Sequence, residues 1–544
     1  MANWQADVIV VGAGSAGCVV AGMLARDPAR RVLLIDAGGR DWNPLLRVPL
    51  MTGVLLRNRY ANWFYHTDPE PNLMGRSLFW PRGKVLGGSS AINGMVWTRG
   101  VAADYDGWAQ RGLPEWTWDK VLATFRGIER HAGPPSDLHG AHGPQPITRL
   151  SALHPLSVAF LEAGIQAGHA FSEDFNGANP EGVGQYDFTI HDGRRVSAFR
   201  SFVAPLVNRD NLRIVTGGHV TRVLLHKGRA IGVELAQGRN RVQHHAAEVV
   251  LSCGTVNTPQ VLMLSGLGPA DTLADHGIKV TADLPGVGRN LRDHLLVRVE
   301  HDCTQPITLH GLLRADRAAM ALGQALVAGT GPAARFPLEV GAFLRSDPTR
   351  EMADLQSHFL PGLSTAAVRV PFGKGKPGAG HGYFANVYQL RPDSTGQITL
   401  RSADPLDAPR IQPNYLSDPG DLRVLRAGVR HLREIFAQSA FAPFRGAERN
   451  PGSARQSDAD LDGWIRANAD TVFHPVGTCK MGTDPMAVVD QHLRVHGIEG
   501  LRVADASVMP TMPGCNTHAP SMLIGARAAS FILGATTEPA HALA

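Results

Sequence analysis

The sequence predicts an α/β protein in which a parallel-sheet nucleotide-binding domain is assembled from separate stretches, with a second domain of sheet and helices inserted between them. Three observations predict this fold. A strand, a glycine-rich turn, a helix and a second strand open the chain. Strand-like apolar runs return at 248–253 and 498–505. A chain of 544 residues is also too long for one compact core.

The opening unit is a β-α-β pattern of about 30 residues. Residues 7–11 and 32–36 are short apolar runs typical of buried strands, and apolar residues between them recur at helical spacing. Gly12, Gly14 and Gly17 form a GxGxxG motif between the first strand and the helix. The first glycine permits a tight turn, the second lets the backbone approach a pyrophosphate, and the third lets the helix pack on the strand.

The phosphates of a dinucleotide are expected at the N-terminus of this helix, beside Ser15 and Ala16, where free N–H groups and a positive dipole lie. Asp36 ends the second strand, 19 residues after Gly17, and is followed by Ala37. Its carboxylate is placed to bind the adenosine ribose hydroxyls. The motif alone does not distinguish FAD from NAD, but Asp36 disfavours NADP because it would repel a 2′-phosphate.

Later segments alternate between irregular, helical and strand-like patterns. We expect long loops over a cofactor at 37–100, helix at 103–131 with a Trp-rich turn at Trp116–Trp118, a small insertion at 151–194, strands and hairpins at 211–235, a block of strands and helices at 300–460 with a Gly/Pro-rich loop at 371–382, and a helix at 519–533. These patterns predict a discontinuous cofactor domain of residues 1–150, 195–300 and 468–540. Residues 151–194 and 301–467 would then form the substrate domain.

Composition narrows the functional class. The formal net charge is +5, without runs of Lys or Arg, which gives a nucleic-acid role little support. Five cysteines lie far apart and never form CxxC, which argues against a disulfide scaffold or a zinc site, and no metal is expected. The first strand begins by Asp7 and no apolar run reaches about 18 residues, so a cytoplasmic location is predicted. Peripheral contact with the inner membrane, through the amphipathic stretch 311–328, is left open.

Four longer motifs carry a family resemblance. Residues 82–100 read RGKVLGGSSAINGMVWTRG, and residues 254–268 read GTVNTPQVLMLSGLG. Both closely resemble the two signatures of the glucose-methanol-choline oxidoreductase family. HPVGTCKMG at 474–482 and DASVMPTMPGCNTHAPSMLIGARAA at 505–529 are similar to its active-site segments. The resemblance runs from residue 7 to about residue 535 and is greatest to the bacterial branch that holds choline dehydrogenase and aliphatic alcohol dehydrogenases.

The resemblance implies a Rossmann-like FAD domain of glutathione-reductase type beside a substrate domain of sheet and helices. The residues that it places around FAD, beyond the opening motif, are Arg82, Gly87, Gly88, Ser89, Asn93, Gly94, Met95, Val96, Val220, Cys253, Gly254, Asp505, Ala506, Asn516 and Thr517. Some family members bind FAD covalently through a histidine two residues after the serine pair. Here the pair is Ser89 and Ser90 and that position is Ile92, so noncovalent FAD is expected.

The resemblance also implies alcohol chemistry. An alcohol becomes a good hydride donor as its hydroxyl proton leaves, so the site needs a base near the O–H group and an acceptor, the flavin, near the C–H group. By resemblance, His474 is the base, and His518 is its partner, which would hydrogen-bond the substrate oxygen. His294 is expected in a structural role near the flavin, and Cys479 as a bystander. His358 is expected either to face the substrate or to pack in the core.

These features predict FAD-dependent oxidation of a primary alcohol, aliphatic or aromatic, to the aldehyde, with electrons passed to a quinone or another acceptor. No carboxylate-plus-aromatic cage is evident, which favours a neutral alcohol over choline. The candidate pocket walls are Val340, Phe359, Leu360, Tyr388 and Phe473, each of which is also a good core residue. Two alternatives remain: an oxidase that passes electrons to oxygen and forms peroxide, and an FAD-containing lyase on the same fold.

Overall fold

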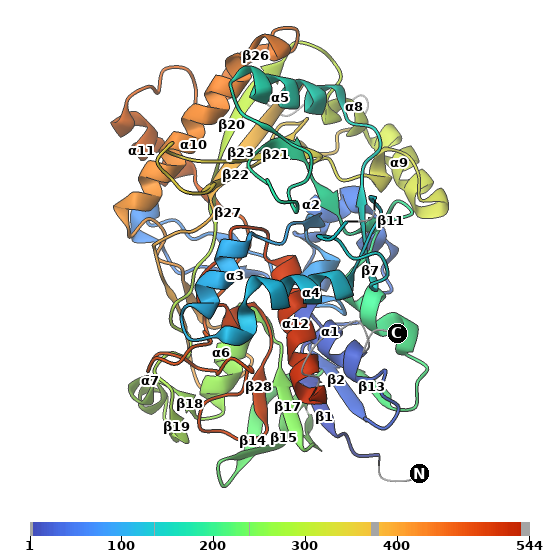
Figure 1. Cartoon of the computed structure of the whole chain (residues 1–544), viewed down its shortest axis with the longest axis vertical. Helices are drawn as coiled ribbons and strands as arrows, with labels where there is room; N and C mark the ends of the chain where they lie inside the picture. Colours follow the sequence, from blue (N-terminus) through green and yellow to red (C-terminus); the bar gives the residue numbers. More distant parts are fainter. Residues whose placement is uncertain (1–3, 135, 239, 371–379, 535–544) are drawn as a thin grey trace.

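The computed structural model describes residues 4–134, 136–238, 240–370 and 380–534. Residues 371–379 of the predicted Gly/Pro-rich loop, and 535–540 at the end of the predicted cofactor domain, lie outside the described residues. Two sheets dominate the molecule, one in the lower half of Figure 1 and one in the upper half. Helices pack against both sheets, and the predicted α/β class is confirmed.

The lower half is built on a five-stranded sheet in which all neighbours are parallel (Figure 1). In sheet order the strands are β13 (Leu212–Thr216), β2 (Val32–Asp36), β1 (Val8–Val11), β17 (Glu248–Leu251) and β28 (Leu501–Val503). Strands from the start, middle and end of the chain therefore lie side by side. β1 and β2 are buried along their whole length, which explains their unbroken apolar sequences.

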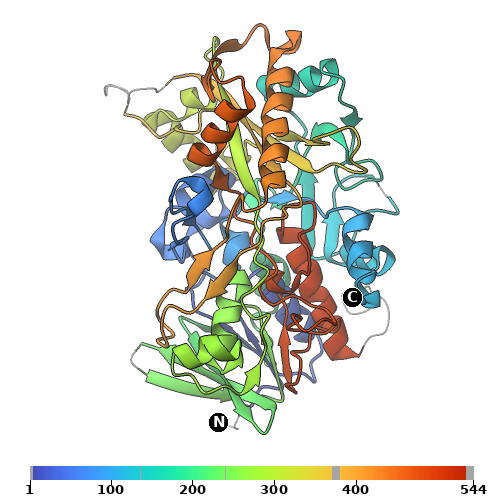
Figure 2. The same cartoon turned by 90° about the vertical axis from the view of Figure 1, so that its left-hand side faces the viewer.

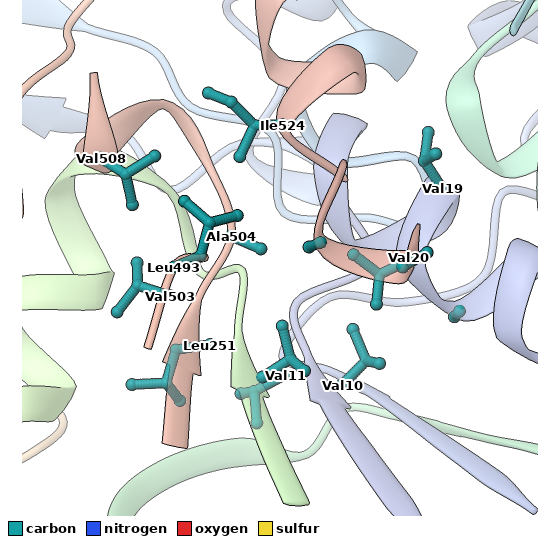
Figure 3. Packing of buried hydrophobic residues seen from close by; sticks show 14 of the residues in the cluster. Val10, Val11, Val19, Val20, Leu251, Leu493, Val503, Ala504, Val508 and Ile524 are labelled. Atoms are coloured by element: carbon teal, nitrogen blue, oxygen red, sulfur yellow. The ribbon is translucent and has the colours of Figure 1, made fainter. Parts of the chain in front are cut away.

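Two helices from opposite ends of the chain, α1 (Ser15–Leu24) and α12 (His518–Leu533), pack against each other beside this sheet. Figure 3 shows Val20 of α1 and Ile524 of α12 among apolar side chains of β1 and β17. Glycines permit the close approach. A Cβ on Gly17 would lie 1.9 Å from the carbonyl oxygen of Gly12, and one on Gly525 would lie 2.4 Å from that of Ala16.

An antiparallel sheet follows β13 and confirms the strands predicted at 211–235. It consists of β14 (His219–His226), β15 (Arg229–Gln237) and β16 (Asn240–His245). The strand predicted at 248–253 ends at Leu251, and α6 (Gly254–Leu264) begins three residues later. This short connection brings the start of α6 close to the end of the parallel sheet.

The upper half is an eight-stranded sheet (Figure 1). The strands along it are β26 (Arg445–Asn450), β20 (Leu295–Cys303), β23 (Gly382–Gln389), β22 (Leu355–Leu360), β21 (Val340–Leu344), β9 (Gly182–Gln185) and β8 (Phe171–Ser172), with β27 (Asp470–Thr471) paired to β20. The longest helix, α10 (Pro419–Ala437), runs along the sheet (Figure 2) and buries Leu425, Val429 and Leu432 there.

The other helices of this half are α5 (Pro155–Gln166), α8 (Leu309–Leu312), α9 (Ala315–Ala328) and α11 (Asp458–Asn468). Because β20 spans residues 295–303, a domain boundary at 300 would cut one hydrogen-bonded strand, although its first two residues and their partner strand β27 fall in the same predicted domain. The two-domain division itself stays a prediction.

Smaller elements complete the two halves and the region between them. The helices among them are α2 (Thr52–Leu55), α3 (Ala102–Ala109), α4 (Trp118–Ile128) and α7 (Ala270–Asp275). A small sheet consists of β5 (Val96–Trp97), β10 (Asp187–Phe188), β7 (Gln145–Arg149) and β6 (Glu129–His131). The strand pairs are β3 (Tyr65–His66) with β4 (Phe79–Trp80), β11 (Ile190–His191) with β12 (Arg194–Arg195), β18 (Leu267–Gly268) with β19 (Ala282–Asp283), and β24 (Gln397–Thr399) with β25 (Arg410–Gln412). All five cysteines are free thiols.

Two predicted segments can now be placed. The segment 103–131 contains two helices, α3 and α4, and the break between them begins before the predicted turn at Trp116–Trp118, because Gly112 adopts a φ of +86° and Pro114 begins a separate turn. The stretch 151–194, predicted as a small insertion, supplies α5 and β9 to the upper half and β10 to the small sheet. The last helix begins at His518, one residue before its predicted start. Among the described helices, none is long and apolar enough to cross a membrane.

Candidate active site

One cavity of about 390 Å³ runs between the two halves, bordered by β1, α1, β20 and the start of α12. The predicted cofactor residues that line it are Gly12, Gly14, Ser15, Ala16, Asp36, Ala37, Arg82, Gly88, Ser89, Asn93, Gly94, Met95, Val96, Val220, Cys253, Gly254, Asp505, Ala506, Asn516 and Thr517. Gly17 and Gly87 lie outside the lining. Gly17 packs α1 against the turn, and the N–H of Gly87 donates to the carbonyl of Ala13 at 2.8 Å.

The turn into α1 is shaped to receive an anion. Gly14 caps the helix without a side-chain hydrogen bond, and the first turn holds no acidic residue. A Cβ on Gly14 would meet no atom within 4 Å, so the backbone here borders open space. The first N–H groups of a helix have no partner inside it, and here they begin at the cavity wall. A pyrophosphate fits this cradle.

Two buried carboxylates hold the walls of this end together. Asp36 accepts hydrogen bonds from the N–H groups of Ala13 and Gly38, both at 2.7 Å. Burial raises the pKa of Asp36 to about 6, although these hydrogen bonds oppose the shift. Asp505 accepts from the N–H of Gly254 at 2.9 Å and from the hydroxyl of Thr258 at 2.6 Å. Each oxygen of Asp36 retains a lone pair for a ligand hydroxyl, and in Asp505 only Oδ1 retains one, because Oδ2 accepts both of these bonds.

At the other end of the cavity, a strained loop presents His474. The preceding residue, Phe473, has a φ of +68°, and its carbonyl accepts from the guanidinium of Arg82 at 2.5 Å. The N–H of His474 donates to Asp293 at 2.7 Å. The other oxygen of Asp293 accepts from the hydroxyls of Tyr415 and Thr471, both at 2.5 Å. These bonds fix the backbone of His474 on a buried anchor.

The side chain of His474 is held in one tautomer. Nε2 of His294 lies 2.8 Å from the carbonyl oxygen of Leu390, which can only accept, so Nε2 of His294 carries a proton. In the neutral ring, Nδ1 of His294 is then an acceptor. It lies 3.0 Å from Nδ1 of His474, which must therefore donate. Nε2 of His474 is left with a lone pair at the cavity. Burial, with the nearby His294, lowers the pKa of His474 well below its ordinary value and keeps this ring neutral.

The side chain that meets this lone pair is Asn516, whose amide nitrogen lies 3.3 Å from Nε2 of His474. The amide is oriented from behind. Its oxygen accepts from the hydroxyl of Thr98 at 2.9 Å and from the side-chain amide of Gln356 at 3.1 Å. With its oxygen occupied, Asn516 can only present N–H groups towards His474 and the cavity. His474 and Asn516 together offer an acceptor and a donor to one substrate oxygen.

The expected pairing of His474 with His518 is not found. His518 begins α12, and its ring points back to α1, where Nδ1 lies 3.0 Å from the hydroxyl of Ser15. Its Nε2 is buried without a hydrogen-bond partner and its ring meets the edge of Trp97. Burial lowers the pKa of His518 to about 4. The turn before α12 thus carries Asn516 to the loop of His474 and His518 to α1, although both residues line the cavity.

Other expectations resolve as follows. His294, expected to be structural, contacts His474 directly, and His358 lines the cavity, where burial lowers its pKa to about 3. Cys479 is buried and does not line the cavity. Among the five candidate pocket walls, only Phe473 lines the cavity. Phe359 and Val340 belong to the upper core, Leu360 lies outside the lining, and Tyr388 packs against the rings of His294 and His474.

Sequence comparison identifies relatives of the whole chain. Models of the GMC oxidoreductase family match residues 6–296 and 392–525. The chain is 46% identical over 538 residues to the mitochondrial choline dehydrogenase of Homo sapiens, covering 97% of this chain and 89% of that protein. It is 44% identical to an oxygen-dependent choline dehydrogenase of Brucella anthropi, covering 98% of this chain and 96% of that protein.

Solved structures show the same architecture. Pyridoxine 4-oxidase from Mesorbium loti matches with a TM-score of 0.87 and 32% identity over 96% of this chain and 98% of that one. A formate oxidase from Aspergillus oryzae matches with a TM-score of 0.91 and 28% identity, covering 98% of both chains. With a glycine-rich cradle, a cavity and a neutral histidine already in place, these matches establish that the chain belongs to the GMC oxidoreductase family and is an FAD-dependent oxidoreductase.

Proposed function

We propose that the protein oxidises a primary alcohol to the aldehyde, with His474 as the base and Asn516 as the donor that holds the substrate oxygen. The observation that carries the proposal is the lone pair on Nε2 of His474, which faces the cavity beside the N–H groups of Asn516. A carbinol oxygen between them would donate its proton to His474 and accept from Asn516. The family of the chain and the names of its relatives support an alcohol as substrate.

Proton and electrons then leave the alcohol separately. The hydroxyl proton moves to Nε2 of His474 and leaves a negative charge on the substrate oxygen, which the amide of Asn516 stabilises. FAD supplies the acceptor for the hydride that leaves the carbinol carbon, and so carries both electrons. The resulting imidazolium keeps its hydrogen bond from Nδ1 to His294. Apolar side chains around the reacting end, among them Leu296, Phe336 and Val472, limit access of water.

The cofactor is proposed to bind without a covalent link, between Gly14 at the α1 cradle and Met95 near the reaction centre. Ile92 lines the cavity and is 1% exposed, and its hydrocarbon side chain offers no atom that could bond to a flavin. His518 is proposed to support the cofactor end through Ser15 rather than to hold substrate. The electron acceptor is proposed to be a quinone or another carrier, with molecular oxygen as the rival.

The test is anaerobic mixing of the purified holoenzyme with a panel of primary alcohols while the visible band of oxidised flavin is followed. Bleaching by an alcohol, with the aldehyde as product, is the expected result. If no alcohol bleaches the flavin, the proposal fails and a lyase gains weight. Admission of air then separates the acceptors, because rapid return of the band indicates an oxidase and slow return a dehydrogenase.

A further inference from the structure

We propose that the substrate end of the cavity selects alcohols whose far end carries no positive charge, and that Arg298 is the residue that sets this preference. The inference rests on the proposed oxidation of an alcohol and names the substrate class of the same site. It sets this chain apart from relatives that are named choline dehydrogenases.

Arg298 lies on β20, near Leu296 at the reacting end of the cavity. Leu296 and Arg298 are two residues apart on one strand, so their side chains share a face, and both line the cavity. Across the ladder, Arg298 pairs with Asn386, a third lining residue. The Arg298 side chain is 29% exposed, so most of it is covered by protein. A substrate whose hydroxyl meets His474 would extend its other end along this face.

The charge of Arg298 is only partly balanced. Its guanidinium lies 3.5 Å from the carboxylate of Asp470, which is 38% exposed and does not line the cavity. The buried Glu300 follows on the same strand, but it accepts from the N–H of Ser364 at 2.7 Å and also lies outside the lining. A ligand in the cavity therefore meets the cation first.

No carboxylate lines the substrate end. Among the described residues, the acidic side chains of the cavity wall are Asp36 and Asp505, which both bind backbone N–H groups at the cofactor end. A quaternary ammonium cannot lose its charge, and burying it without a carboxylate is unfavourable. Phe336 and Phe473 offer aromatic surface, but a neighbouring guanidinium opposes the cation that such surface would attract.

Choline and 3,3-dimethylbutan-1-ol test the proposal directly, because they have nearly the same shape and differ by one positive charge. The holoenzyme is mixed with each, and the rate of flavin reduction is measured against concentration. We expect kcat/KM for the uncharged alcohol to exceed that for choline by at least about tenfold. Equal rates, or preference for choline, would overturn the inference while leaving alcohol oxidation intact. Reduction by neither of these compounds nor any other alcohol would instead count against the proposed function.

Variants assign the preference to one side chain. Arg298→Met should raise the ratio of choline to uncharged-alcohol kcat/KM by about tenfold, and Arg298→Glu should raise it further. Asp470→Asn, which leaves the cavity lining untouched, should lower the ratio by exposing the full charge of Arg298. Arg222→Met is the matched control, since Arg222 pairs with Glu234 at 2.9 Å and lies outside the lining, on the strand that begins at the cofactor end of the cavity. If Arg298→Met and Arg222→Met change the ratio equally, or Asp470→Asn raises it, Arg298 does not set the preference.

Discussion

At the scale of single residues, the chemistry depends on which ring nitrogen of His474 carries the proton. The carbonyl of Leu390 orients His294, and His294 in turn accepts a hydrogen bond from Nδ1–H of His474. A neutral neighbour thus does the orienting that a carboxylate does in a Ser-His-Asp triad. Because no negative charge faces Nδ1, the pKa of His474 is not raised, and its Nε2 stays unprotonated near neutral pH.

Removal of the base should slow the chemical step and leave the cofactor bound. We expect His474→Ala to reduce the rate of anaerobic flavin reduction by about a hundredfold or more, with normal FAD content. Stopped-flow absorbance with a saturating alcohol measures the rate. His226→Ala, an exposed histidine at the end of β14, is the control and should behave as wild type. A wild-type rate in His474→Ala would remove this residue from the mechanism.

The role of His294 is one of positioning, and two substitutions separate it from mere packing. In His294→Asn the amide can still accept from Nδ1 of His474, so kcat should stay within about tenfold of wild type. In His294→Leu an apolar side chain fills the space but cannot accept a hydrogen bond. We expect kcat to fall by about ten- to a hundredfold, because His474 can then adopt the wrong tautomer. Pre-steady-state rates and flavin content check both variants. Equal losses in the two would show that only volume matters at this position.

The link to FAD is also a single-residue property. Because Ile92 has no nucleophilic atom, acid precipitation should release all of the flavin into the supernatant. Absorbance of supernatant and pellet measures the partition. Flavin that stays with the precipitated protein would contradict noncovalent binding, and Ile92→His, which restores the position used by some relatives, is the informative comparison.

Motifs in the sequence point to single residues but not to the contacts between them. The loop of His474 was predicted because its motif is long and distinctive, and the role of His474 stays a prediction. His518 was the predicted partner, whereas the structure places Asn516, two residues earlier, 3.3 Å from Nε2 of His474 and directs His518 towards Ser15. His294 meets His474 from a position 180 residues away, and no local pattern reports such a contact.

At the scale of elements, the turn from β1 into α1 contains one glycine that serves folding and another that serves cofactor binding. Gly17 faces protein, where a Cβ would lie 1.9 Å from a carbonyl oxygen. Gly14 faces the cavity, and its φ of −82° is open to any residue. Of these two glycines, Gly17 is therefore required for packing, whereas Gly14 serves cofactor binding.

Alanine at each position should separate these roles. Gly17→Ala should lower the stability of the folded protein by about 1–3 kcal/mol, because backbone must move to admit the methyl group. Gly14→Ala should leave the melting temperature of the apoprotein unchanged and weaken FAD binding, because its methyl group enters the space of the pyrophosphate. Thermal melts of apoprotein and FAD titrations measure the two. Normal FAD affinity in Gly14→Ala would place the phosphates elsewhere.

Elements were predictable wherever burial is continuous. β1, β2 and β17 are buried on both faces, so their apolar runs stand out from the sequence. The break inside 103–131 was predicted at Trp116–Trp118, but it begins by Gly112, because it depends on the positive φ of that glycine rather than on a change in periodicity. Boundaries of this kind follow from tertiary packing.

At the scale of the whole molecule, the discontinuous layout could be predicted and the sheet order could not. Similar strand-like runs at both ends and in the middle of the chain indicated a shared sheet. That β28 lies beside β17, and that β27 extends the ladder of β20, depends on pairings between distant strands. An apolar run indicates that a strand is buried, but it does not indicate which strand pairs with it.

Buried neutral histidines predict loss of stability in acid. Burial lowers the pKa values of His294 and His358 to about 3 and that of His518 to about 4, so the unfolded chain binds more protons below its ordinary pKa of about 6.5. Stability therefore falls as pH falls from about 6.5, by about 1.4 kcal/mol per pH unit for each ring. Asp36 and Asp293, with pKa values raised to about 6 by burial, offset part of this loss between about pH 6 and 4.

The histidines outnumber the two carboxyls and shift further, so the net slope is downward. Melting temperatures of the apoprotein should decrease steadily from pH 7 to pH 4.5. A series in which His358→Gln replaces one buried ring should show a shallower decrease. A melting temperature that rises over this range would show that the carboxyls dominate.

The cavity wall draws on residues from Val11 to Ser521, so segments near both ends of the chain border one cavity. A ligand held by both ends of a polypeptide can bind well only after those ends have met. Its binding free energy is then shared with folding, and each tenfold rise in free FAD above its dissociation constant adds about 1.4 kcal/mol to the folded state. The concentration of free FAD would therefore govern how much of this protein stays folded, as well as how fast it works.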